Sequence, residues 1–191
     1  MYLPLAVSIV AAVSLAHADP IRDSPPNHGL ARFAGAPAIT DNGTIVFKGN
    51  YAVDSVGKTG IFYRELISTP SGGKTAVEMV ASSDTEIPNA PPSFRKMSFG
   101  STAPPSVSGD QLVFVGLDNE EYPNFGGIYL APIRPNPELR TLVSINSPLP
   151  GVKIDAITRL GEGLAFDGRY VAFWGAWGNE TKTVRLFCPE D

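Results

Sequence analysis

Three short apolar runs recur along the chain, and each is followed within two residues by a glycine. The runs are Ile45-Val46-Phe47, Leu112-Val113-Phe114-Val115 and Tyr170-Val171-Ala172-Phe173-Trp174. Most of their residues are β-branched or aromatic, which favours strands, and the apolar positions are consecutive instead of alternating. This pattern is typical of strands that are buried on both faces. We therefore predict that each run lies in a small sheet stacked between two other layers.

Each apolar run belongs to a longer unit whose other parts also recur. A turn-forming segment precedes each run: Asp41-Asn42-Gly43, Ser108-Gly109-Asp110 and Asp167-Gly168. These residues supply the positive φ angles that a tight hairpin needs. Phe47 and Gly60 are 13 positions apart. Phe114 and Gly127 are also 13 positions apart, so we predict one shared register for the central strands of the first two units.

The recurring units predict an all-β fold of about three four-stranded antiparallel meanders. In the first unit we expect strands at about Pro37 to Thr40, Thr44 to Lys48, Ile61 to Leu66 and Val77 to Ala81, with a loop from Asn50 to Thr59. The 19 glycines and 18 prolines among 191 residues fit many turns between short strands. We expect a Pro-rich lead-in loop at 19–36 and a repeat domain at 37–191, with units at about 37–96, 97–153 and 154–191.

The residues of these units resemble a known kind of repeat. The matching positions are Gly43, Phe47, Gly49, Gly60, Ile61, the segment from Ser83 to Pro88, Phe99, Gly100, Pro105, Phe114, Gly116, Gly127, Ile128, Tyr129, Pro150, Gly151, Phe173 and Gly175. From about Arg32 to Leu186 the chain resembles secreted bacterial tandem-repeat proteins with Gly-x-Val-x-Phe-x-Gly and Gly-Ile-Tyr motifs, which are thought to form β-propeller blades. The resemblance implies a partial propeller and no particular activity.

The number of units leaves an alternative fold and an assembly question open. Closed propellers use about four to eight blades, and this chain offers about three units. A β-prism of three sheets, which three units could complete alone, is the alternative. In a partial propeller the outer faces of the first and last sheets would be exposed and apolar, so we expect self-association or further sequence.

The first 18 residues have the pattern of a secretory signal. An apolar run from Leu3 to Leu15 is followed by Ala16-His17-Ala18, which matches a small-x-small cleavage site. The run is too short to predict a stable membrane span. The alternative is an outer strand of a preceding repeat. Secretion agrees with the glycosylation sequons at Asn42 and Asn179, and Cys188 is the single cysteine, so no disulfide within the chain is expected.

Charge and motifs narrow the chemistry that the chain could perform. A net charge of -4 and a pI near 5.2, without a basic cluster, argue against a nucleic-acid partner. Beyond the signal segment the only histidine is His28, which disfavours a histidine metal site or a Ser-His relay. We expect no cofactor, no metal and no catalytic residue. The loop Asp118-Asn119-Glu120-Glu121 could bind calcium, although a solvated acidic loop explains it more simply.

In a meander, alternate connections lie at the same end of the sheet. The longer polar loops Asn50 to Thr59, Asp118 to Gly126 and Ala176 to Lys182 should therefore share one end, opposite the tight turns. Variable loops on a rigid scaffold are where ligands usually bind. We predict ligand contacts from these loops at Asp54, Asp118, Glu120, Tyr122 and Trp177. Trp174 continues an apolar run and is expected in the core.

These observations favour a secreted, non-enzymatic repeat protein that binds a protein or carbohydrate ligand. One alternative is a carbohydrate-active enzyme or carbohydrate-binding protein on a propeller. Its paired carboxylates would come from Asp54, Asp118, Glu120 or Glu121. The other alternative is a structural or truncated repeat fragment.

Overall fold

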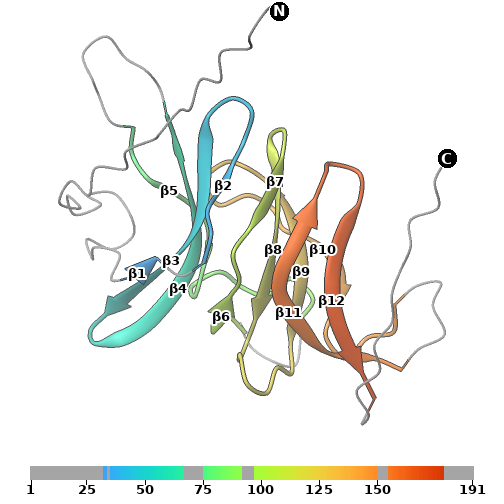
Figure 1. The fold of residues 1–191 in the computed structure, drawn as a ribbon. Coiled ribbons are helices and arrows are strands. Elements are labelled where there is room, and N and C mark those ends of the chain that lie inside the picture. Colours follow the sequence, from blue (N-terminus) through green and yellow to red (C-terminus); the bar gives the residue numbers. More distant parts are fainter. Residues whose placement is uncertain (1–31, 34, 67–74, 92–96, 150–154, 179–191) are drawn as a thin grey trace, which may run out of the picture.

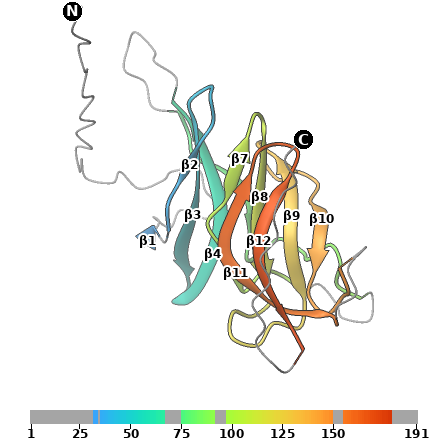
Figure 2. The same cartoon turned by 45° about the vertical axis from the view of Figure 1, so that its right-hand side comes forward.

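The computed structural model describes residues 32–33, 35–66, 75–91, 97–149 and 155–178. Every regular element in these ranges is a strand, and the strands form three antiparallel sheets, which confirms the all-β prediction. Figure 1 shows the sheets side by side in chain order, and the rotated view in Figure 2 keeps them as separate layers. The described residues accordingly include no helix that could cross a membrane.

Sheet 1 contains β1 (Arg32–Phe33), β2 (Ala38–Ile39), β3 (Thr44–Val53), β4 (Val56–Glu65) and β5 (Glu78–Ser82). Strands β2 to β5 form the predicted antiparallel meander. Strand β1 also pairs with β3, so β3 has two short partners. The prediction of a loop throughout 19–36 is therefore wrong at β1, because two residues of the lead-in segment complete the sheet.

Sheet 2 repeats this arrangement with β6 (Ser101–Thr102), β7 (Ser106–Ser108), β8 (Gln111–Leu117), β9 (Gly126–Pro132) and β10 (Arg140–Ser144). Strands β6 and β7 both pair with β8, just as β1 and β2 pair with β3. Strands β7 to β10 form a second meander. Two units of different sequence thus share one strand plan.

Sheet 3 consists of β11 (Ile157–Phe166) and β12 (Val171–Trp177). Strand β11 is long, and its pairing with β12 shifts register between Ile157 and Arg159 and again between Leu160 and Leu164. The hairpin between the two strands turns at Gly168, which has a φ of 96°. The part of the third predicted unit that follows Gly178 lies outside the described residues.

A glycine pair recurs at the centre of sheets 1 and 2. Gly49 pairs with Gly60, and Gly116 pairs with Gly127, so the predicted shared register is confirmed. Gly127 also pairs with Ser144 of β10, just past a bulge between Thr141 and Val143, and a Cβ atom on that glycine would overlap the carbonyl oxygen of Val143. The recurring glycine therefore allows the backbone of the fourth strand to approach closely.

The connector from Asn50 to Thr59 differs from the predicted loop. Strands β3 and β4 continue through it and meet at a two-residue turn, Asp54 and Ser55, with φ angles of 49° and 67°. Two positive φ angles are the geometry of a hairpin turn whose twist matches the strands. The equally long connector in sheet 2 is a loop, and it contains Pro123, which cannot donate a hydrogen bond to a neighbouring strand. The equal length of the two connectors did not predict that one is a hairpin and the other a loop.

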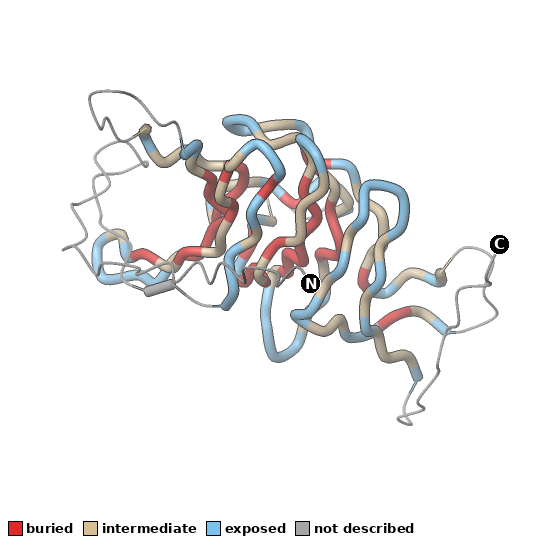
Figure 3. The backbone as a smooth tube through the Cα atoms, turned by 45° about the horizontal axis from the view of Figure 1, so that its top comes forward, coloured by how far each residue is buried: buried red, intermediate tan, exposed pale blue. Residues whose placement is uncertain are grey.

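Two apolar cores separate the three sheets. The first lies between sheets 1 and 2 and contains Val46, Ile61, Tyr63, Val80, Ala81, Ile87, Phe99, Leu112, Phe114, Tyr129, Ala131 and Leu139. The second lies between sheets 2 and 3 and contains Ala103, Val115, Leu117, Ile128, Ile145 and Ile157, with Leu160, Leu164, Val171 and Phe173 against it. Figure 3 shows buried backbone concentrated in sheets 1 and 2 and mostly intermediate or exposed positions in sheet 3.

The apolar runs therefore have different surroundings. In sheet 2, every residue from Leu112 to Leu117 is buried, which confirms the prediction of a strand covered on both faces. In sheet 3 the same prediction is wrong, because Tyr170 and Trp174 are 61% and 57% exposed. Val171 and Phe173 alternate with them and contact the second core. The last described sheet is thus covered on one face.

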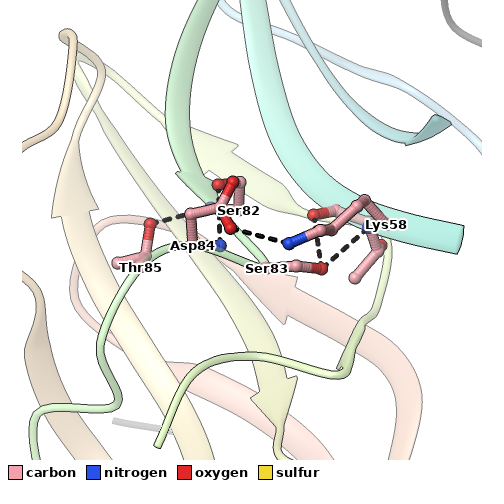
Figure 4. A network of polar contacts seen from close by, with 6 residues as sticks. Lys58, Ser82, Ser83, Asp84 and Thr85 are labelled. Atoms are coloured by element: carbon pink, nitrogen blue, oxygen red, sulfur yellow. Dashed lines mark hydrogen bonds and ion pairs between the residues drawn. The ribbon is translucent and has the colours of Figure 1, made fainter. Parts of the chain in front are cut away.

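A polar turn closes sheet 1 and begins the connection to sheet 2 (Figure 4). The backbone N–H of Ser82 donates to Thr85 Oγ1 at 2.9 Å, and the N–H of Asp84 donates to Ser82 Oγ at 3.1 Å. Lys58 on β4 donates to Asp84 Oδ1 at 2.7 Å, and this bond raises the pKa of Lys58. These contacts fix the direction in which the chain leaves β5.

We predict that Gly127→Ala lowers the free energy of unfolding by about 3 kcal/mol, because the added methyl group must displace the backbone of β10. Gly57→Ala is the matched control. Gly57 lies in β4 with no atom within 4 Å of an added Cβ, so its change should stay within about 0.5 kcal/mol. Urea denaturation of both variants measures the difference. Equal stability of the two variants would contradict the close approach at Gly127.

Candidate functional site

The loop between β8 and β9 is held in shape by its own side chains. Asp118 Oδ1 accepts hydrogen bonds from the backbone N–H groups of Asn124 and Phe125, both at 3.0 Å. The N–H of Asp118 donates to the carbonyl oxygen of Phe125 at 3.1 Å. The carboxylate therefore joins the two ends of the loop, and the residues between them project as one turn.

The tip of this loop presents two carboxylates and a tyrosine. Asn119 Oδ1 accepts from the N–H groups of Glu121 and Tyr122, at 2.9 and 3.0 Å, which is a side-chain turn that Asn readily makes. Ser101 of β6 donates its hydroxyl hydrogen to Glu120 Oε2 at 3.3 Å. Tyr122 is 75% exposed. The loop thus holds polar and aromatic groups toward solvent in a defined arrangement.

Sheet 3 supplies the facing wall. Arg159 and Leu160 lie where the register of β11 shifts, and Trp174 lies on the neighbouring strand β12. The Trp174 side chain crosses Gly161, since a Cβ atom there would be 3.3 Å from Trp174 Cε3. A larger residue at that position would push against the indole. The glycine in the irregular part of β11 therefore gives the indole room to lie against the strand.

The loop and the wall enclose an open groove of about 540 Å³ between sheets 2 and 3. It is lined by Leu117, Glu120, Glu121, Tyr122, Pro123, Arg159, Leu160 and Trp174. Apolar side chains lie beside three charged ones. The carboxylates can accept hydrogen bonds, the guanidinium can donate them, and the aromatic faces can stack on a ligand.

Two of the five predicted ligand-binding residues, Glu120 and Tyr122, line this groove. Asp118 lies in the same loop, and its carboxylate is engaged by the loop backbone. Asp54 lies in the β3–β4 turn with a positive φ, a conformation that Asp tolerates. Trp177 is half-buried at the end of β12 and pairs with Ile157. The structure does not place Asp54 or Trp177 in the groove.

The loops do lie at one end of the molecule, as the meander argument requires. In Figure 1 the β3–β4 turn, the β8–β9 loop and the end of β12 are all at the lower end, and the three tight turns are at the upper end. The tight turns contain Gly43, Gly109 and Gly168, all with positive φ. Residues 179–182 of the third predicted loop lie outside the described part.

Trp174 is the groove residue that sequence reasoning assigned wrongly. It was expected in the core because it ends an apolar run, yet its side chain is 57% exposed. The alternation along β12 explains the error, since Val171 and Phe173 pack against the second core and Ala172 and Trp174 are exposed. The alternation of a half-buried strand, applied to these residues, would have predicted an exposed Trp174.

A second hollow of about 320 Å³ lies near the same end, and it is lined mainly by residues that bond to one another. Asn89 donates to Ser144 Oγ at 2.9 Å and accepts from the Tyr129 hydroxyl at 2.6 Å. Burial raises the pKa of that hydroxyl, and so does Asp118 to a smaller extent. Asn146 donates to the carbonyl oxygen of Asn124 at 3.0 Å. Asn89 thus joins the segment after sheet 1 to sheet 2, and Asn146 joins two loops of sheet 2, so the polar groups of this hollow are used in holding the fold together.

Of the two glycosylation sequons, only Asn42 lies in the described residues. It is exposed in the β2–β3 turn, where its Oδ1 accepts from the N–H of Thr44 at 3.2 Å and from the hydroxyl of Thr40. Asn179 lies outside them, as do the predicted signal segment and His28. Glycosylation stays a prediction at both positions.

Among the described residues no three acidic, histidine or cysteine side chains gather in a way that could hold a metal ion.

Comparison with known proteins gives no further assignment. No protein-family model matches the chain, and neither the curated proteins nor the solved structures contain a match. The groove must therefore be interpreted from its own geometry.

We predict that Asp118→Ala lowers the free energy of unfolding by about 2 kcal/mol, because two backbone N–H groups lose a charged acceptor. Glu138→Ala removes an exposed carboxylate from the β9–β10 connection and should change stability by less than about 0.5 kcal/mol. Thermal or urea unfolding of both variants tests this. If Asp118→Ala is as stable as the control, the carboxylate does not organise the loop.

Proposed function

We propose that this chain is a secreted, non-enzymatic repeat protein that binds its ligand in the groove between sheets 2 and 3. Its three sheets would be consecutive blades of a propeller-like fold. Secretion is supported by the apolar segment and Ala-x-Ala site at the start of the chain, and by an exposed asparagine at the Asn42 sequon.

The blade interpretation rests on how the sheets pack. Sheet 1 packs on one face of sheet 2 and sheet 3 packs on the other, so two apolar cores lie one after the other in the stack. In a prism, three sheets would surround a single core. Two separate cores therefore favour the stacked order of a propeller over the prism. Within the described residues the sheets do not close into a ring, and completion of the ring by self-association or by further sequence is part of the proposal.

The observation that carries the binding proposal is the pair of exposed aromatic side chains in one groove. Tyr122 and Trp174 are 75% and 57% exposed and come from different units, yet they line the same hollow. Exposed aromatic side chains that lie together in one hollow are common at binding sites, whereas single ones are ordinary. A mixture of aromatic and hydrogen-bonding side chains is typical of ligand sites.

The carboxylates of the groove support binding more than hydrolysis. Glycoside hydrolases place two carboxyl groups on either side of the bond to be cleaved. Here Glu120 and Glu121 are neighbours in one loop, Asp118 is engaged by backbone groups, and Asp54 is not in the groove. The facing wall contributes Arg159 instead of a second acid. A carbohydrate-active enzyme is therefore the weaker proposal.

We predict that small-molecule fragments bind preferentially in this groove. The two tryptophans offer a built-in comparison, since Trp174 lines the groove and Trp177 does not. In a fragment screen by NMR, binders should shift the indole N–H signal of Trp174 and leave that of Trp177 unchanged. Trp174→Ala should weaken the binding of the same fragments by about tenfold.

The control is Tyr170→Ala, which removes an equally exposed aromatic ring at the far end of sheet 3, where Arg169 lies 5.1 Å from the ring centre. It should leave fragment binding unchanged. Fragments that gather elsewhere, for example at the hollow beside Asn89, would move the site away from Trp174.

A further inference from the structure

We infer that the groove between sheets 2 and 3 takes a polyhydroxylated chain, that is, an oligosaccharide without anionic groups. This inference rests on the proposed binding function and adds the chemical class of the ligand. Three properties of the groove support it: its open shape, its two carboxylates against one guanidinium, and its exposed aromatic rings.

The shape favours a chain over a compact small molecule. The groove is open to solvent, and its volume of about 540 Å³ is within the range of about 300–1,000 Å³ that is usual for ligand sites. Compact ligands are usually bound in sites that enclose most of their surface. A groove that is open to solvent lets part of a longer ligand bind while the rest of the ligand stays outside.

The charges disfavour an anionic ligand. An anion would meet two carboxylates, those of Glu120 and Glu121, against the one guanidinium of Arg159. A hydroxyl group suits both kinds of side chain, because it donates a hydrogen bond to a carboxylate and accepts one from a guanidinium. Neighbouring hydroxyls on a sugar ring can therefore bond to the opposite walls together. Hydrogen bonds from a ligand hydroxyl to a charged side chain are also stronger than hydrogen bonds between two neutral groups.

The aromatic rings supply the apolar part of sugar recognition. One face of many sugar rings carries C–H groups, which can pack on an aromatic face, while the hydroxyls at the ring edge reach polar side chains. Trp174 on sheet 3 and Tyr122 on the loop are exposed enough to be covered in this way. Leu117, Leu160 and Pro123 form the apolar surface around them.

The loop is ordered before the ligand arrives. Asp118 and Asn119 together accept four backbone hydrogen bonds inside the loop that carries Glu120 to Tyr122. Fixing these side chains in advance lowers the entropy that binding must remove. This matters for sugars, whose hydroxyls already bond to water and gain little from each exchange.

Calorimetric titration with defined oligosaccharides tests the inference. The probes are neutral pentasaccharides of glucose, mannose, xylose and N-acetylglucosamine, each of which offers ring faces and hydroxyls. At least one should bind, and Trp174→Ala should weaken that binding by about tenfold or more. Trp174→Phe keeps an aromatic face and should retain most of the affinity. Tyr170→Ala, outside the groove, should bind like the wild type.

An anionic counterpart of the same sugars separates the ligand classes. A glucuronic acid oligomer should bind at least about tenfold more weakly than the best neutral probe, because it meets two carboxylates in the groove. Glu120→Gln should weaken binding of the neutral probe, whereas Glu138→Gln, at an exposed site outside the groove, should not. Tighter binding of the glucuronic acid oligomer would overturn the inference.

Failure of this inference and failure of the proposed function give different results. If fragments shift the Trp174 signal but no neutral oligosaccharide binds, the groove is a binding site for another class and only the inference is wrong. If neither fragments nor sugars affect Trp174, both are wrong. Oligosaccharide binding that persists in Trp174→Ala would place the sugar site elsewhere on the protein.

Discussion

The structure depends on one strand that is apolar on both faces. In β8, Leu112 and Phe114 pack into the first core, and Val115 and Leu117 pack into the second. Burying each such side chain fully contributes about 1.5–3 kcal/mol, so this strand stabilises contacts in two directions. Sheet 3 has two described strands, and its apolar face is buried because it packs against sheet 2. Sheet 2 therefore holds the other two sheets in place.

The groove follows from the same packing. Its loop leaves sheet 2 directly after Leu117, and its facing wall begins at Arg159, close to Ile157 in the second core. Because residues of two units meet there, the distance between Tyr122 and Trp174 depends on how sheets 2 and 3 pack. Gly127 contributes indirectly, since it lets β10 approach β9 at the base of the loop. Binding and folding are thus linked through one interface.

The sequence predicted the repeated parts well, because repetition is a direct signal of shared geometry. The equal spacing from Phe47 to Gly60 and from Phe114 to Gly127 anticipated the observed register. Prediction failed where two segments of equal length differ in local chemistry. The connector around Asp54 is a continuous hairpin, and the one around Tyr122 is a loop. Trp174 was misplaced because its burial depends on whether a further layer covers sheet 3, which a local apolar run does not reveal. Glu120 and Tyr122 were predicted from loop position, but their neighbours Arg159 and Trp174 required the packing of two units.

Hydrogen–deuterium exchange tests the central role of sheet 2 most directly. Strands covered on both faces open only in the larger unfolding events, so their amides exchange slowest. We expect the strongest protection in Leu112 to Leu117 of β8 and in Gly127 to Ala131 of β9, intermediate protection in sheet 1, and the weakest in β11 and β12. Sheet 3 amides as strongly protected as those of β8, or sheets that open independently of one another, would contradict the view that sheet 2 supports the whole fold.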